Sequence, residues 1–396
     1  MTEHDQPGTP SLAGLRVLDL GWVWAGPLVG AALADLGADV VKVEAEGRFD
    51  PYRLRGVERR RDLGELRREA SPSFHKLNRS KRSIALNLRT AEGLDVLLRL
   101  AGRADLLLEN FSAGTQERLG LGWERLKAAN PEIVSLSMSA GGQQGQWRDL
   151  RAYALVTSGL AGYESLVAYE GEEPVGAPTF GVADPTVSAF GLLGALAAIW
   201  RARRTGRGAY VDLSGVEALM GVMPEAFLDV EGNRDEDERT VAAFEFTLGD
   251  VDEDRWVVFV VTSEAQWNAF CQALGGTPPA TWARLAEAAR ARLATREWLA
   301  GLPLESCVAA AAAAGVASAP VLSVEERNAA APIRDLMGEL THPVTGPEPW
   351  HPSPWGTWRE PSPAPRLGEH TDAVLQEWLG MEAAELADLR DSGAFS

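Results

Sequence analysis

The chain has 396 residues, of which 45% are hydrophobic and 24% are charged, the composition of a soluble globular protein long enough for two domains. Its net charge of -18 argues against non-specific nucleic-acid binding, because a polyanion would be repelled over most of the surface. Two distant cysteines, Cys271 and Cys307, and a polar start without a signal-peptide pattern favour a cytoplasmic protein with no membrane segment.

The first part of the chain alternates short apolar strands with helices. A strand–helix–strand unit occupies residues 15–44, and its small-residue helix ends at Gly37. The same pattern returns between residues 83 and 139, with strands expected at 83–88, 104–111 and 132–139 and helices at 91–103 and 124–131. Strands that alternate with helices predict an α/β fold with a parallel sheet in a Rossmann-like arrangement.

A long apolar helix is expected next, over residues 183–204, and a TGRG turn then leads into a strand at 209–214. Residues 225–325 change character to acidic loops, a strand at 255–261 and helices rich in Ala and Trp, which predicts a smaller α+β domain. The Pro- and Trp-rich residues 342–365 are expected to form a surface connection without regular structure. We therefore expect a large domain from 1–224, completed by a return segment 326–396 with two short helices, and a small domain from 225–325.

Five separated segments resemble one enzyme family. They are LAGLRVLDLGWVWAGPLVGAALADLGADVVKVE, FHKLNRSKRSIALNLRTAEG, ADLLLENFSAGTQERLGLGWERLKAANPEIV, GALAAIWRARRTGRGAYVDLS and PAPRLGEHTDAVL. In this order and spacing they resemble the class III CoA-transferase family (CaiB/BaiF type), which includes formyl-CoA transferase and carnitine CoA-transferase. The resemblance implies an interlocked homodimer of two-domain subunits. It also implies that acyl-CoA and a small carboxylic acid are the substrates, with no tightly bound cofactor. Separately, the scattered histidines and the lack of an HExxH motif argue against a metal site.

The resemblance assigns the nucleophile to Asp184, which precedes the long helix leading to the TGRG turn. A carboxylate of this kind attacks the thioester of acyl-CoA and carries first an anhydride and then a CoA thioester. The competing interpretation is structural, since Asp followed by Pro185 is a typical helix N-cap with Pro at the first helical position, worth about 1 kcal/mol. The residues alone favour the cap, and the resemblance favours catalysis. Pro185 departs from the small residues that usually follow the family's aspartate.

The resemblance also implies contacts to CoA, which needs an apolar slot, backbone donors and arginines. Leu86, Leu88 and Phe111 would be buried core whatever the function, and Arg89 would also suit a solvated strand end. Asn110 and Arg118 are harder to explain as core and are therefore the better candidates. The complete set of expected contacts is Trp24, Ala25, Leu86, Asn87, Leu88, Arg89, Asn110, Phe111, Ser112 and Arg118.

Three further positions depart from the family pattern. Trp24 stands where many relatives have Gln, and Ala45 where formyl-CoA transferase has an arginine, for which Arg48 is the candidate replacement. Arg151 stands where relatives usually carry an acid, with Asp149 two residues earlier, so either a small insertion lets Asp149 supply the acid or the acceptor pocket has changed polarity. An arginine there would suit the second carboxylate of a dicarboxylic acid.

Three other functions compete with CoA transfer. A non-catalytic CoA-binding homologue is suggested by Trp24, Ala45, Arg151 and Pro185. An acyl-CoA racemase would need a histidine near Leu150, but no histidine lies between His75 and His342. An NAD-dependent dehydrogenase is suggested by the first strand–helix–strand unit, but its turn is GWVWAGPLVG rather than GxGxxG.

Overall fold

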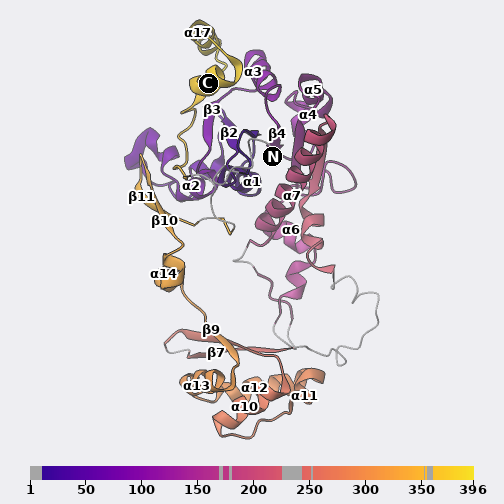
Figure 1. Cartoon of the computed structure of the whole chain (residues 1–396), viewed down its shortest axis with the longest axis vertical. Coiled ribbons are helices and arrows are strands. Elements are labelled where there is room, and N and C mark those ends of the chain that lie inside the picture. Colours follow the sequence, from indigo (N-terminus) through magenta and orange to yellow (C-terminus); the bar gives the residue numbers. More distant parts are fainter. Residues whose placement is uncertain are drawn as a thin grey trace. The chain divides into compact units, whose positions relative to one another are not determined.

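The computed structural model describes residues 11–168, 173–177, 181–224, 243–250, 253–351, 353–354 and 360–396. The chain divides into two compact units, whose elements are labelled in Figure 1. The large unit comprises Met1–Ser165, Gly176–Val222 and Leu336–Ser396, and the small unit comprises Leu166–Val175 and Met223–Asp335. The large unit thus resumes at Leu336 rather than at residue 326, because two short helices, α14 (Val324–Ala329) and α15 (Ala331–Arg334), belong to the small unit.

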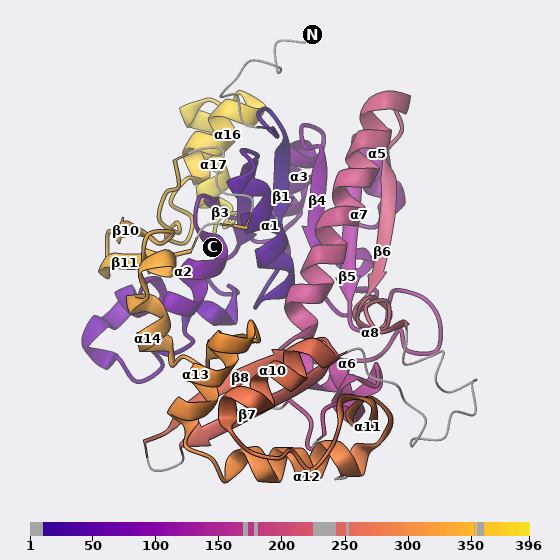
Figure 2. The same cartoon turned by 60° about the horizontal axis from the view of Figure 1, so that its bottom comes forward.

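Six parallel strands form the central sheet of the large unit, in the order β3-β2-β1-β4-β5-β6 (Figure 2). They are β1 (Arg16–Asp19), β2 (Asp39–Glu44), β3 (Arg82–Ala85), β4 (Leu106–Glu109), β5 (Val134–Ser139) and β6 (Ala209–Ser214). β1 and β4 pair directly at the centre of the sheet, with Val17 opposite Leu106. The predicted strands are confirmed, and their order is that of a doubly wound Rossmann sheet.

Helices cover both faces of this sheet, which is why a central strand such as β4 is buried along its whole length. One face carries α1 (Ala25–Asp35) and α7 (Ala183–Thr205), whose Val29, Leu33 and Ile199 join the core beneath them. The other face carries α3 (Ala91–Ala101), α5 (Trp123–Ala129), α16 (Thr371–Leu379) and α17 (Ala383–Asp391). The remaining elements of this unit and its boundary are η2 (Pro51–Arg53), η3 (Arg61–Glu69), α2 (Pro72–Asn78), α4 (Thr115–Arg118), α6 (Ala154–Leu160), η4 (Tyr163–Leu166) and α8 (Gly215–Met220).

Helix α7 is the one helix of the described chain whose length and composition would let it cross a membrane. Its Ala195 and Ala202 are buried, and the helix contacts α1, β5 and β6. This packing is typical of a core helix with one face on a sheet. On other faces of α7, Leu193 and Trp200 leave 65% and 62% of their surface exposed.

The expected surface connection over residues 342–365 is wrong at its beginning. β10 (Gly338–His342) and β11 (Gly346–Trp350) form an antiparallel hairpin there. Gly346 adopts a φ of 79°, which glycine tolerates and which allows the tight turn. Proline is accepted in β11 because this strand belongs to a two-stranded ribbon and is free on its outer edge. The prolines of β11 are therefore the reason that this strand was not predicted from the sequence. Residues 352 and 355–359 of the segment lie outside the described residues.

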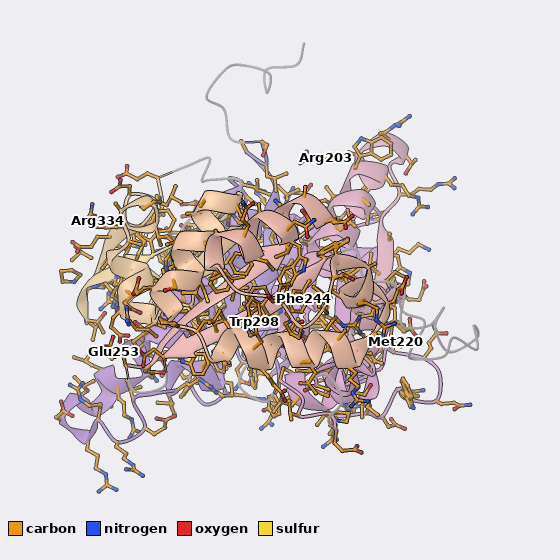
Figure 3. All side chains as sticks on the ribbon, turned by 90° about the horizontal axis from the view of Figure 1, so that it is seen from below. Arg203, Met220, Phe244, Glu253, Trp298 and Arg334 are labelled. Carbon is orange, nitrogen blue, oxygen red and sulfur yellow. The ribbon has the colours of Figure 1, made fainter. Side chains whose placement is uncertain are left out.

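The small unit contains a three-stranded antiparallel sheet in the order β7-β8-β9. Its strands are β7 (Phe244–Asp250), β8 (Arg255–Val261) and β9 (Ala317–Pro320), and its other helices are α10 (Glu264–Leu274), α11 (Trp282–Glu287), α12 (Ala289–Ala300) and α13 (Leu304–Ala314). Aromatic side chains fill its core, including Phe246 and Phe259, whose rings stack at 5.0 Å. Figure 3 shows Phe244 and Trp298 within this packed region, and Glu253 at its margin.

A buried arginine joins three parts of the large unit. Arg53 donates hydrogen bonds to Glu44 at 2.7 Å and to Glu69 at 2.8 Å, and its guanidinium lies 3.8 Å from the ring centroid of Phe74. Burial alone would raise the pKa of Glu44, but the charge and hydrogen bonds of Arg53, with the charge of Lys42 and the Asp50 N–H, together hold that pKa below its usual range. Arg53 therefore allows the Glu44 carboxylate to remain ionised inside the fold and joins it to Glu69.

Replacing Arg53 by Met is expected to lower the free energy of unfolding by about 3–5 kcal/mol, because Glu44 would remain as an uncompensated buried charge. Urea denaturation measures this loss. Arg60→Met is the matched control, since Arg60 pairs with Asp62 on the exposed surface, and its midpoint should not change. Equal midpoints for the two variants would contradict the role given to Arg53.

Candidate active site

The carboxyl ends of the strands open into a cavity of about 490 Å³ in the large unit. β1 and β4 are neighbours, yet their following connections run to opposite sides, which leaves a crevice at this edge of a doubly wound sheet. The cavity is lined by the segments after β1, β4 and β5, by residues 150–154 and by the start of α7. The lining residue of most chemical interest is Asp184.

Asp184 is the second residue of α7, which begins at Ala183 and has Val182 as its N-cap. The proposed N-cap role of Asp184 is therefore wrong, and Pro185 lies in the first turn, where a missing backbone N–H removes no helical bond. Among the described residues, the Asp184 carboxylate has no hydrogen-bond or ion-pair partner. Burial raises the pKa of Asp184 to about 6. A half-buried, unpaired carboxylate at the wall of a cavity is free to react.

Ser188 fixes the turn that carries Asp184. Its buried hydroxyl lies 2.7 Å from the carbonyl oxygen of Asp184 and 2.9 Å from that of Ala25, the first residue of α1. One hydroxyl can donate to either carbonyl or be shared between them. The start of α7 and the start of α1 are therefore held together as adjoining walls of the cavity.

A smaller cavity of about 180 Å³ adjoins the first and is lined mainly by apolar groups. The two share four lining residues, Trp22, Arg48, Phe111 and Thr115. Trp22 and Phe111 meet edge to face with centroids 6.1 Å apart, and the Arg48 guanidinium lies 5.4 Å from the Trp22 ring. The smaller cavity thus provides an apolar slot, Arg48 provides a cation next to it, and the larger cavity contains the Asp184 carboxylate.

The comparisons with known proteins agree with this geometry. A family model described as CoA-transferase family III matches residues 12–371. The chain belongs to CoA-transferase family III. The beta subunit of succinyl-CoA–L-malate CoA-transferase from Chloroflexus aurantiacus is 31% identical over 409 residues, covering 96% of this chain and 97% of that protein. Formyl-CoA:oxalate CoA-transferase from Streptomyces avermitilis is 28% identical over 419 residues, covering 97% and 99%.

Solved structures show the same likeness. A CaiB/BaiF family protein from Brucella suis aligns with a TM-score of 0.76 at 27% identity, covering 92% of this chain and 98% of that one. As a family III CoA-transferase, the chain acts on CoA thioesters. The family assignment made from the five segments is confirmed, and the dehydrogenase hypothesis is dropped.

The structure brings most of the expected CoA contacts to the two cavities. Trp24, Ala25 and Ser112 line the cavity that contains Asp184, and Phe111 lines both. The strand-end residues Leu86, Asn87, Leu88 and Arg89 line the smaller cavity, together with Ala45. Their contact with CoA stays a prediction.

Asn110 and Arg118, the two preferred candidates, lie differently. Asn110 reaches the larger cavity, but its amide is engaged by the backbone of Trp22, with bonds of 2.7 Å to the nitrogen and 2.9 Å to the oxygen. Arg118 lines neither cavity and donates to the Thr115 hydroxyl at 2.6 Å. Asn110 therefore shapes the wall of the site, and Arg118 supports a residue that both cavities share.

Sequence reasoning did not identify four residues that line the larger cavity, namely Trp22, Val23, Thr115 and Tyr153. Trp22 and Val23 follow β1 directly, so the rule that ligands bind at the carboxyl ends of parallel strands would have found them. Tyr153 lies in a loop without periodicity, and no sequence signal pointed to it.

Two arginines, Arg48 and Arg151, are the cations among the described residues that line the larger cavity. The guanidinium of Arg151 has no hydrogen-bond or ion-pair partner among the described residues. Asp149, the possible acidic substitute, leaves 94% of its side chain exposed and does not line the cavity. The side chain at position 151 is therefore positively charged, which suits an anionic group of the substrate.

Proposed function

We propose that this family III CoA-transferase moves CoA from an acyl-CoA donor to a carboxylic acid acceptor through covalent intermediates on Asp184. The observation that carries the proposal is the unpaired carboxylate of Asp184 at the wall of the larger cavity. A cation within ion-pair distance would lower the basicity of this oxygen and so weaken it as a nucleophile.

The reaction needs four acyl transfers and no external proton. The Asp184 oxygen attacks the thioester carbonyl, the C–S bond breaks, and a mixed anhydride and CoA thiolate form. The thiolate then attacks the aspartyl carbonyl carbon and releases the donor acid, which leaves an aspartyl-CoA thioester. The acceptor carboxylate attacks that thioester, giving a second anhydride and thiolate. The thiolate finally attacks the acceptor's acyl carbon, which releases the new acyl-CoA and restores Asp184.

The two cavities suit the two ends of an acyl-CoA. The apolar lining of the smaller cavity fits the adenine, and Arg48 lies between it and the larger cavity, where a phosphate would pass. The thioester would then lie beside Asp184. Arg151 would bind an anionic group of the acid, and the relatives named for L-malate and oxalate support a dicarboxylic acceptor.

We also propose that the chain forms the homodimer that the family resemblance implies, with the two subunits interlocked. The exposed apolar residues of α7, Leu193 and Trp200, support an interface with a second copy. The malate relative is named by alpha and beta subunits, so a pair of unlike chains is the alternative assembly.

The non-catalytic homologue was suggested by the departures at Trp24, Ala45, Arg151 and Pro185, and the family match and the relatives named as CoA-transferases disfavour it. An acyl-CoA racemase is disfavoured by the site, because the described residues that line the larger cavity include no histidine. A covalent aspartyl adduct separates transfer from both alternatives.

Asp184→Ala is expected to lower the rate of CoA exchange between acids by at least about 1000-fold, because the nucleophile is lost. Mass spectrometry after acyl-CoA and hydroxylamine should show a modified Asp184 in the parent protein and none in the variant. Asp149→Asn removes a nearby exposed carboxylate and serves as the control with full activity. Exchange by Asp184→Ala at the parent rate would rule out the mechanism.

The rate of aspartyl adduct formation should rise with pH through about 6 and then level off. The raised pKa of Asp184 means that the nucleophilic, ionised form is lost as pH falls through about 6. At pH 5 the rate should be about one tenth of its plateau. Rapid-quench measurement from pH 5 to 8 tests this.

Glu109 is the control for that profile, because burial raises its pKa to about 7. The apparent pKa of adduct formation should stay near 6 in Glu109→Gln. A flat profile in the parent, or a midpoint that disappears in Glu109→Gln, would show that another group governs the step.

Leu193→Glu combined with Trp200→Glu is expected to prevent assembly of the dimer and to give a monomeric chain, because two charges would enter the proposed α7 interface. Light scattering on the purified chain measures the mass. Leu336→Glu changes another exposed leucine and should leave the dimer intact. A monomeric parent chain would contradict the homodimer.

A further inference from the structure

Val23, in the wall of the larger cavity, has a strained backbone. Its φ is 68°, in the left-handed region that β-branched residues avoid. Such a conformation persists only where the surroundings impose it, and it is concentrated at functional sites. The residues that impose it on Val23 can be identified from the hydrogen bonds of the loop.

Asp50 is the residue that holds Val23. Its Oδ1 accepts the backbone N–H of Val23 at 3.0 Å and that of Tyr52 at 2.9 Å. Asp50 is itself fixed, since Glu44 accepts its backbone N–H at 3.0 Å and the Lys42 ammonium lies 3.3 Å from its Oδ2. Lys42 and Asp50 are fully buried, so this contact is shielded from water.

The loop on either side of Val23 is held as firmly. The Lys42 ammonium donates to the Gly21 carbonyl at 2.6 Å, and the amide of Asn110 bonds both backbone groups of Trp22. After Val23 the chain enters α1 at Ala25, whose carbonyl accepts from Ser188 beside Asp184. The left-handed turn at Val23 therefore sets where this wall stands relative to the reactive carboxylate.

We propose that Asp50 is a positioning residue for acyl transfer at Asp184, acting through the strained conformation of Val23. Asp50 does not line either cavity, so it has no direct contact with substrate to lose. Without its Oδ1, Val23 would relax toward negative φ and move the Val23–Ala25 wall. This inference rests on the proposed reaction at Asp184 and adds a residue outside the cavity to it.

The test is a double-mutant cycle between Asp50 and Val23 that measures kcat, KM and the rate of adduct formation. Asp50→Ala should lower kcat about 10- to 100-fold, the effect of losing one hydrogen bond to a charged group, with a smaller change in KM. Asp50→Asn keeps an acceptor oxygen and should recover most of this loss. In a Val23→Gly background, Asp50→Ala should cost much less than in the parent, because glycine adopts positive φ without strain.

If Asp50→Ala lowers kcat equally in the parent and in the Val23→Gly background, the proposal is overturned and Asp50 only stabilises the fold. Leu100→Ala, in the core on the opposite face of the sheet, provides a control that destabilises the fold without touching the loop. If Asp50→Ala does not fold, the cycle is run with Asp50→Ala and Lys42→Met together, and Lys42→Met alone serves as the reference because it also removes the bond to the Gly21 carbonyl. The Asp184→Ala result tests the reaction independently, so failure of the mechanism is distinguished from failure of the positioning role.

Discussion

The direct pairing of β1 with β4 is the constraint on which the site depends. These strands are adjacent in the sheet but separated in sequence by two other strands, and each leads into a connection on a different side. Backbone connections alone cannot fill the crevice between them. The side-chain amide of Asn110, after β4, makes two hydrogen bonds to the backbone of Trp22, after β1, and so joins the two sides of the crevice at its floor. The cavity above that floor exists because the sheet changes its winding direction there.

The electrostatics of the site depend on Asp184, whose carboxylate has no charged partner among the described residues. Two other buried carboxylates of the large unit have cationic partners, since Glu44 pairs with Arg53 and Asp19 pairs with Lys81, each at 2.7 Å. Asp184 has none among the described residues, so burial alone acts on it and raises its pKa. A carboxylate with a pKa of about 6 is still mostly ionised at neutral pH and is more basic than an exposed one. Asp184 is therefore both ionised and strongly nucleophilic. An ion pair would have kept it ionised but made it a weaker nucleophile.

The strands and helices of the large unit could be predicted because each must bury an apolar face, and that requirement appears in the sequence as periodicity. Three features could not. β11 was hidden because its prolines suit only a ribbon edge, which is a property of the pairing. Helix α7 begins at Ala183 as expected, but its cap residue is Val182, which makes no side-chain bond, rather than Asp184. The bonding of Asn110 to Trp22 joins residues 88 apart, and no local pattern indicates it.

The C-terminal segment has a consequence for how the protein is made. Glu69 accepts the backbone N–H of Leu367 at 3.2 Å, and Ser83 at β3 accepts that of His370 at 2.8 Å. These bonds join residues nearly 300 positions apart, so the ribosome releases the first strands long before their partners exist. The small unit, whose bulk is continuous in the chain, can fold in the interval. The edge of the sheet at β3 is covered only after the last helices have been made, and until then it is open to chaperones and to aggregation.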